Sequence, residues 1–302
     1  MTSLREGLRP NLGGHPDETD ASQAVAATRS SRLSALPARL IRRRGLRELL
    51  LIAVVYCIYD TSRFFVEGRQ ATAFAHGARV LNLEAGLDVA WEQTVNNAIA
   101  AHRLLAVPAD YLYATLHYVV TPLVLIWMWR RHRNDYSRAR TTLMVATILG
   151  LIGFTLLPVA PPRMLPGFVD TMAQYSNWGW WSQDASAPRG VGQFTNEFAA
   201  MPSLHVGWAL WCGWQLIRHG RHRITQIAGV LYPALMVVVV IATGNHYLLD
   251  AVAGIAVVML AGMAVGGVQR LRPAKVIDLD AHRLVDVTEV AQVPAPRTSA
   301  TA

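Results

Sequence analysis

The sequence has little charge and almost no lysine. Of its 302 residues, 16% are charged and 52% are hydrophobic, whereas soluble proteins carry about 25% charged residues on average. Lys275 is the sole lysine, so the formal net charge of +8 comes almost entirely from arginine. Basic chains often bind nucleic acid, but these arginines lie between long apolar runs. The pattern therefore favours a membrane protein and argues against a nucleic-acid partner.

Cysteine is scarce as well, and the N-terminal segment lacks the apolar core of a signal peptide. Cys57 and Cys212 lie in apolar runs without a CxxC pair, so they are expected to be plain core residues and not a metal or redox pair. Residues 1–37 are rich in Gly, Pro, Ser and Arg and predict a disordered tail. Residues 271–302 predict a second disordered tail, on the cytoplasmic side.

Six apolar runs lie between these tails, most of them near the ~20 residues that cross a bilayer. They are Leu49–Val66, Tyr111–Trp129, Thr141–Ala160, Leu204–Ile217, Ile224–Thr243 and Tyr247–Val268. We therefore predict an all-α fold, a polytopic membrane protein whose catalytic domain, residues 38–270, is a bundle of six transmembrane helices. The alternative is a soluble protein with buried helices, which so many apolar runs disfavour.

Arginines mark four of the segments around these runs and predict the orientation. Five lie in residues 39–47, just before the first run, and five lie in residues 130–140. Three lie in residues 218–223, after the fourth run, and Arg270 and Arg272 follow the sixth together with Lys275. Positively charged short loops stay on the cytoplasmic side. Both termini are therefore predicted to be cytoplasmic, in an integral protein of a bacterial plasma membrane.

The predicted outer segment between the first and second runs carries apolar residues at three- and four-residue spacing, which predicts an amphipathic helix. This helix would lie on the membrane interface or cover the end of the bundle. Its apolar positions are Val80, Leu83, Leu87, Trp91, Val95 and Ala98.

Three short motifs fall at the predicted outer face: residues 158–163 (Pro-Val-Ala-Pro-Pro-Arg), 200–205 (Ala-Met-Pro-Ser-Leu-His) and 244–250 (Gly-Asn-His-Tyr-Leu-Leu-Asp). Arg163 presents a fork of donors that suits phosphate oxygens, unless it snorkels to lipid headgroups. Ser203 is a good N-cap, and a helix beginning there offers free N–H groups to an anion. His205, in its first turn, can protonate a leaving oxygen or is structural.

His246 and Asp250 are four residues apart and share a helix face. Asp250 would fix the tautomer of His246 and leave its other nitrogen free as a nucleophile or base, unless the pair only ties helices together. Two other functions stay open. The two residues and His205 could ligate zinc in a membrane metal hydrolase, although no Glu adjoins either histidine as a base. A transporter or scaffold could use the same pair, although no internal repeat supports it.

Together the motifs resemble those of the type 2 phosphatidic acid phosphatase superfamily, which carries Arg-Pro, Pro-Ser-Gly-His and His-x-x-x-Asp on a six-helix bundle. Pro-Ser-Leu-His and Asn-His-Tyr-x-x-Asp look most like the branch of inositol phosphorylceramide synthases and bacterial inositolphosphotransferase-like proteins. The resemblance spans roughly residues 46–268 of this chain.

The resemblance implies a lipid phosphoryl-transfer enzyme, a phosphatase or an inositolphosphotransferase, that needs no metal or cofactor. His246 would form a phosphohistidine with Asp250 orienting it, and His205 would protonate the leaving group. The phosphoryl oxygens would be held by Arg163, Ser203 and Leu204. The implied partners are a lipid phosphate or phospholipid, membrane lipids, and a polyol or inositol acceptor, at an extracytoplasmic site.

The chain departs from the phosphatase pattern where two cations are usual. A Lys seven residues before Arg163 is replaced by Leu156, and an Arg six residues before His246 is replaced by Val240. In addition, Leu204 replaces the Gly of Pro-Ser-Gly-His. These departures favour the transferase-like branch.

Further residues are accessory candidates. Arg63 or Arg189 could supply a missing cation, unless Arg63 pairs with Asp60. His117, within the second run, either supports a catalytic residue or makes a structural hydrogen bond, and Asn245 adjoins the predicted nucleophile. The outer loop from 164 to 200 predicts an interfacial anchor or a lid, because it contains Trp178, Trp180 and Trp181.

Overall fold

The computed structural model describes residues 46, 50, 69–181, 197–271, 275–277 and 284–286. The chain divides into two units, Met1–Cys57 and Ile58–Ala302, and the fold described below belongs to the second. The predicted N-terminal tail, the first predicted span apart from Leu50, and Asp60, Arg63 and Arg189 lie outside the described residues.

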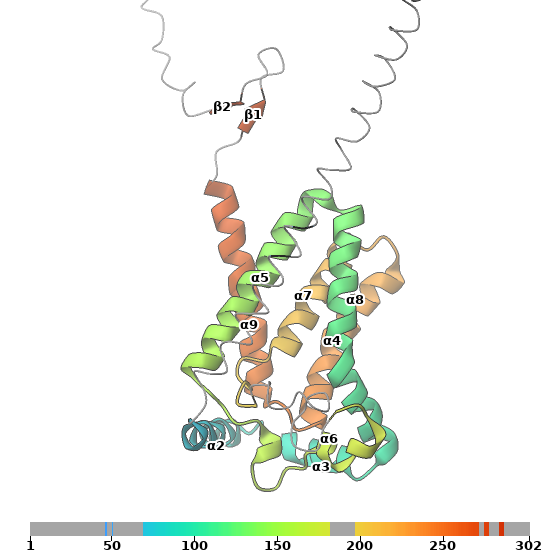
Figure 1. Cartoon of the computed structure of the whole chain (residues 1–302), viewed down its shortest axis with the longest axis vertical. Helices are drawn as coiled ribbons and strands as arrows, with labels where there is room; N and C mark the ends of the chain where they lie inside the picture. Colours follow the sequence, from blue (N-terminus) through green and yellow to red (C-terminus); the bar gives the residue numbers. More distant parts are fainter. Residues whose placement is uncertain are drawn as a thin grey trace, which may run out of the picture. The chain divides into compact units, whose positions relative to one another are not determined.

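Five long helices form a bundle (Figure 1). They are α4 (Arg103–Arg131), α5 (Arg133–Leu156), α7 (Leu204–His219), α8 (Arg223–Ala242) and α9 (Leu248–Leu271). Within the described residues, α4, α5, α8 and α9 are long and apolar enough to cross a membrane. Their outer surfaces expose large apolar side chains such as Leu104 and Ile224, which only a lipid environment accommodates on this scale. The chain is thus an integral membrane protein, and among the described residues four of the six predicted spans are candidate membrane-crossing helices.

The predicted fourth span differs from these four in length. Helix α7 has 16 residues, which rise ~24 Å, less than the ~30 Å of a hydrocarbon core. It lies in the middle of the bundle, where Val206, Ala209 and Cys212 are fully buried. Six spans therefore stay a prediction, because α7 is short and the first run lies outside the described residues.

Arginine-rich helix ends lie at one end of the bundle. Helix α4 ends at Arg131 and α5 begins at Arg133, so the predicted loop from Arg130 to Arg140 is wrong: it is helical except at His132. The first turns of α7 and α9 lie at the opposite end, next to α2 (Gln70–Gly86) and α3 (Glu92–Ala100) (Figure 1). Three short helices complete that end: η2 (Pro162–Met164), α6 (Thr171–Gln174) and η3 (Ser176–Trp178).

The predicted amphipathic helix is two helices, because the chain turns between α2 and α3, where Asp88 has φ of 58°. The apolar residues Leu83, Leu87 and Trp91 are exposed. Glu84, Glu92 and Asn96 are fully buried, whereas Val80 and Val95 are partly buried and pack against the core. This arrangement fits helices on a membrane interface, and they also cover the bundle, since α3 contacts α8 and α2 contacts α9.

The three tryptophans of the outer loop do not act alike. Trp178 and Trp180 are exposed, as an interfacial anchor would be. Trp181 is fully buried against Ala114 and Met172, and its indole Nε1 donates to the carbonyl of Met172 at 2.8 Å. The third tryptophan thus fastens the loop to α4 instead of anchoring it in lipid.

A short hairpin follows α9. Strands β1 (Lys275–Ile277) and β2 (Leu284–Asp286) pair antiparallel, with Val276 opposite Val285. Both strands fall within the predicted C-terminal tail. They make up the β-sheet found among the described residues. The remaining described elements are helical, as the sequence predicted.

Helices α7 and α9 touch where small residues face each other. A Cβ on Gly254 would collide with the carbonyl oxygen of Ser203, and one on Gly207 would lie 3.2 Å from the Gly254 carbonyl. Small residues allow such close backbone approach in membrane bundles. This contact brings the first turns of the two helices together.

We expect Gly254→Ala to destabilise the protein by about 1–3 kcal/mol, as overpacking of a tight contact does. Gly267→Ala on the same helix is the control, because its new Cβ would meet nothing within 4 Å. Thermal unfolding in detergent measures both. Equal melting temperatures for the two variants would contradict the tight crossing.

Candidate active site

The imidazole of His246 is held through one nitrogen only. Its Nδ1 lies 2.8 Å from the carbonyl oxygen of Ala200 and 3.4 Å from Oδ2 of Asp250. Both neighbours accept hydrogen bonds, so Nδ1 carries the proton. Nε2 is buried and has no hydrogen-bond partner among the described residues, so its lone pair is free.

Asp250 joins the two motif-bearing helices. Its Oδ2 accepts a hydrogen bond from the N–H of Tyr247 at 2.9 Å, and its carbonyl accepts one from the N–H of Ser203 at 2.9 Å. The residue is fully buried. The carboxylate therefore orients His246 while its backbone fixes the start of α7.

His205 lies beside His246, with the ring centroids 5.6 Å apart. Its ring stacks on Tyr113 at 4.4 Å and meets the edge of His117 at 4.4 Å. Nδ1 of His117 is 3.1 Å from the carbonyl oxygen of Tyr113. His117 thus makes a structural hydrogen bond and also packs on His205. Tyr113 was not predicted as a site residue, although its four-residue spacing from His117 places both on one face of α4.

The predicted phosphate-binding residues of α7 act differently from one another. The Ser203 hydroxyl caps the helix by accepting from the N–H of Val206, and its own N–H is used by Asp250. The Leu204 side chain packs against Leu151 and Phe154. Leu204 can therefore bind an anion only through its backbone N–H, which is one of the groups that a helix start leaves unpaired.

Arg163 is fixed by three polar neighbours. Its Nε donates to Oδ1 of Asn245 at 3.1 Å, and a terminal nitrogen donates to Oδ2 of Asp170 at 2.9 Å. The other terminal nitrogen is 4.0 Å from Oε1 of Glu197. The backbone of Arg163 donates to Gly244 at 2.7 Å. Asn245, the residue before His246 in the chain, thereby holds the guanidinium, while the two carboxylates were not foreseen.

Gly244 makes this arrangement possible. Its φ of 68° is a left-handed conformation that residues with a Cβ rarely adopt. A Cβ here would also lie 3.1 Å from the Asn96 amide and 3.3 Å from the Arg163 side chain. The turn between α8 and α9 therefore needs glycine.

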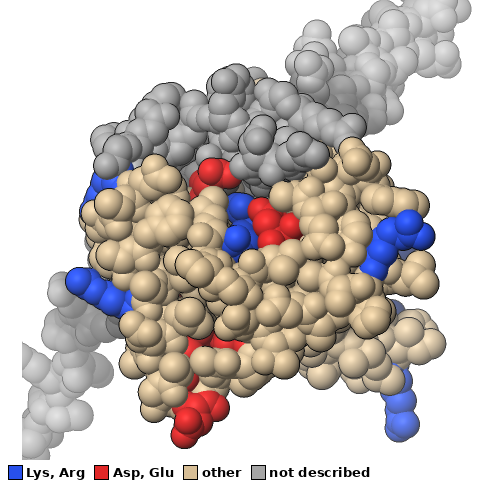
Figure 2. Space-filling model, turned by 90° about the horizontal axis from the view of Figure 1, so that it is seen from below, with Lys and Arg blue, Asp and Glu red and all other residues tan. Residues whose placement is uncertain are grey.

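Acidic and basic side chains adjoin near the middle of this end of the bundle (Figure 2). The two positions at which the phosphatase pattern has a Lys and an Arg are uncharged in this chain. Leu156 is exposed at the end of α5, and Val240 is fully buried. Among the described residues, no three His, Cys, Asp or Glu side chains form a group that could hold a metal ion.

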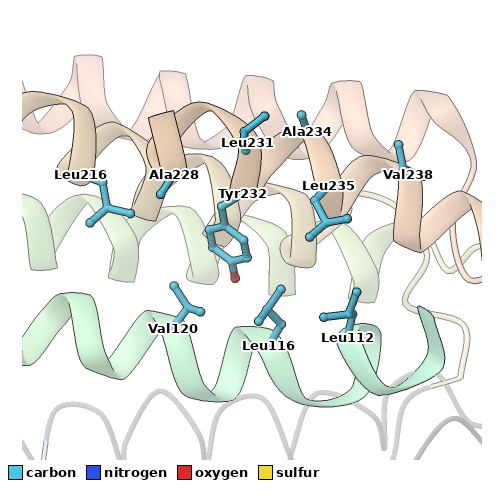
Figure 3. A pocket seen from close by; sticks show the side chains of 10 residues that line it. All are labelled: Leu112, Leu116, Val120, Leu216, Ala228, Leu231, Tyr232, Ala234, Leu235 and Val238. Carbon is cyan, nitrogen blue, oxygen red and sulfur yellow. The ribbon is translucent and has the colours of Figure 1, made fainter. Parts of the chain in front are cut away.

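A separate hollow of about 740 Å³ lies between α4, α7 and α8. Its lining is apolar except for Tyr232, whose hydroxyl points across the hollow toward α4 (Figure 3). It offers no charged group for a phosphate. The histidine cluster, not this hollow, has the chemistry of an active site.

The family model of the PAP2 superfamily matches residues 78–264, more than half of the chain. The chain belongs to the PAP2 superfamily. It is an enzyme of the lipid phosphatase kind, which confirms the resemblance at the level of the superfamily. Among solved structures, Aquifex aeolicus LpxE is 22% identical with a TM-score of 0.43, over 58% of this chain and 92% of that chain. No curated protein matches the chain.

For this PAP2 enzyme we expect Asp250→Asn to lower kcat by up to ~10⁴, the loss seen when a histidine is held in the wrong tautomer. The amide can still accept from the Tyr247 N–H, so the turn should persist. Turnover of a lipid phosphate and the melting temperature should be measured together. A folded variant with wild-type kcat would contradict the orienting role.

Proposed function

We propose that this enzyme transfers the phosphoryl group of a lipid phosphate through a phosphohistidine on Nε2 of His246. The observation that carries the proposal is the free, buried Nε2 of His246 opposite an Nδ1 that Ala200 and Asp250 hold. A nucleophile oriented in this way divides one difficult step into two easier ones. The adjacent ring of His205 supplies a proton donor.

In the first step the Nε2 lone pair attacks phosphorus and the bond to the lipid oxygen breaks. The leaving oxygen takes a proton from protonated His205, so a lipid alcohol departs. In the second step water or an acceptor hydroxyl attacks phosphorus and gives its proton to His205. The P–N bond breaks, its electron pair returns to His246, and phosphate or a new phosphate ester leaves.

The negative charge on the phosphoryl oxygens must be stabilised by hydrogen-bond donors. Arg163 and the free N–H groups at the start of α7 would provide them, because a helix N-terminus and a guanidinium both favour an anion. Phosphoryl transfer depends mainly on such positioning and charge stabilisation. The site would open to the extracytoplasmic side, since the arginine-rich turns lie at the other end of the bundle and mark the cytoplasmic side.

One observation favours a transferase over a plain phosphatase. Asp170 and Glu197 flank Arg163, so this edge of the site carries negative charge beside the positive one. Carboxylates repel a phosphate dianion but accept hydrogen bonds from hydroxyl groups. A polyol such as inositol fits this edge as acceptor, in agreement with the inositolphosphotransferase-like motifs.

Purified protein given a ³²P-labelled lipid phosphate and quenched in alkali should retain acid-labile label on His246. His246→Ala should form no labelled protein and show no turnover. Arg103→Lys is a control at the same end of the bundle, where Arg103 stacks on Trp178. Full turnover by His246→Ala would refute the mechanism.

The role of His205 can be separated from binding by varying the leaving group. His205→Asn should lower kcat on an alkyl phosphate by ~10²–10⁴, the usual contribution of a general acid. The loss should be much smaller on p-nitrophenyl phosphate, whose leaving group needs no proton. Equal losses on both substrates would contradict a proton donor.

The acceptor is identified by incubating the labelled enzyme with inositol, glycerol or water alone. A transferase should move the label to inositol, and a phosphatase should release inorganic phosphate at an unchanged rate. Asp170→Asn should reduce transfer to inositol relative to hydrolysis, because it removes an acceptor charge. An unchanged product ratio would count against the acceptor edge.

A further inference from the structure

Three carboxyl groups from three helices meet at the first turn of α9. Oε1 of Glu84 in α2 accepts the N–H of Leu249 at 2.7 Å, and Oε1 of Glu92 in α3 accepts the N–H of Leu248 at 3.1 Å. Oδ2 of Asp250 accepts the N–H of Tyr247 at 2.9 Å. Three consecutive N–H groups, which a helix start leaves unpaired, are therefore all bound to carboxyl oxygens.

Two of these carboxyl groups face each other without solvent. Glu84 and Glu92 are fully buried and bind the N–H groups of two adjacent residues, Leu249 and Leu248, which places the two carboxyl groups side by side. The second oxygen, Oε2, of each receives no donor from the described residues. Two ionised carboxylates in such contact repel each other, so the pair is stable only when it shares a proton.

The electrostatics of Glu84 agree with a shared proton. Burial raises its pKa to about 8, with further upward contributions from Glu92 and Asp250 and an opposing one from the N–H of Leu249. The titratable groups that face it are Glu92 from α3, Asp250 from α9 and Tyr247 before α9. The Tyr247 hydroxyl donates to the carbonyl of Ala160, so it does not neutralise the pair.

We propose that Glu84 and Glu92 are positioning residues, a proton-sharing carboxyl pair that clamps the first turn of α9 and so sets the geometry of His246 and Asp250. The link to catalysis rests on the proposed function. The clamp acts through the backbone: the bound N–H groups of Leu248 and Leu249 immediately precede Asp250. Movement there would disturb both the contact with His246 and the hydrogen bond from Ser203.

The proton makes the clamp sensitive to pH. The folded protein binds it more tightly than the unfolded chain, because the pKa of Glu84 is raised from 4.5 to about 8. Stability should therefore fall as pH rises from about 4.5 to about 8 and stay level above that. Activity should fall near pH 8, where the folded pair loses its proton and the two carboxylates repel.

Glu84→Gln tests the clamp in the full-length enzyme in detergent. The glutamine Oε1 can still accept from Leu249, and its amide can donate to Glu92 without titrating. Wild-type kcat should fall about tenfold one pH unit above the pKa of a single required proton, with KM unchanged. Glu84→Gln should keep its kcat to pH 9 and lose the fall in melting temperature between pH 5 and 8.

Two further variants complete the experiment. Glu84→Ala removes the cap and should lower kcat at every pH, and Glu84→Gln should restore it. Asp88→Asn alters an exposed carboxylate just after α2 and should leave both pH profiles as in the wild type. The proposal is overturned when Glu84→Gln and the wild type share the same pH dependence of kcat and of melting temperature.

The melting temperatures keep this test separate from the proposed function. When His246→Ala retains turnover but Glu84→Gln flattens the melting profile, the phosphohistidine mechanism fails and the clamp stands. When His246→Ala is inactive but Glu84→Gln follows the wild type in both profiles, the clamp fails and the mechanism stands.

Discussion

At the crossing of α7 and α9, the Ser203 N–H donates to the carbonyl of Asp250, and Gly254 packs against Ser203 without room for a side chain. The rest of the site depends on this contact. Asp250 orients His246 from one side of the crossing, and Ser203 caps the helix that carries His205 on the other. Both imidazoles are thereby placed by backbone geometry at this crossing.

Helices α2 and α3, which cover the end of the bundle that carries the site, have the side-chain pattern expected at a membrane interface. In a soluble protein, the apolar stripe of α2 and α3 would face the core. Here Leu83, Leu87 and Trp91 face outward, and Glu84 and Glu92 face inward to the unpaired N–H groups of α9. Lipid accepts the apolar side, while buried backbone groups need polar partners. The inward-facing glutamates thus let these two helices stabilise the start of α9, while other apolar residues of the same helices, such as Val80 and Val95, still pack inward.

The sequence was sufficient for the parts of this structure that are local. Apolar runs predicted α4, α5, α8 and α9, and motif spacing predicted that His205, His246 and Asp250 would meet. It could not predict which side of α2 and α3 faces inward, since an apolar stripe with the same periodicity can face either the lipid or the protein core. Glu84 and Glu92 were missed because their partners are backbone N–H groups 165 and 156 residues away in the chain. Asp170 was missed although its partner Arg163 is only seven residues away, because the irregular loop between them has no periodicity to read.

Charge distribution, more than the catalytic residues, is what separates a hydrolase from a transferase at this site. Both reactions need the same histidines, and water needs no recognition. Asp170 and Glu197 hold Arg163 in either reaction, but under the proposed function their negative charge would also weaken the attraction for a phosphate dianion. A hydroxylated acceptor gains hydrogen bonds from them. The missing cations at Leu156 and Val240 point the same way, since a site that must also bind a polyol cannot be surrounded by positive charge alone.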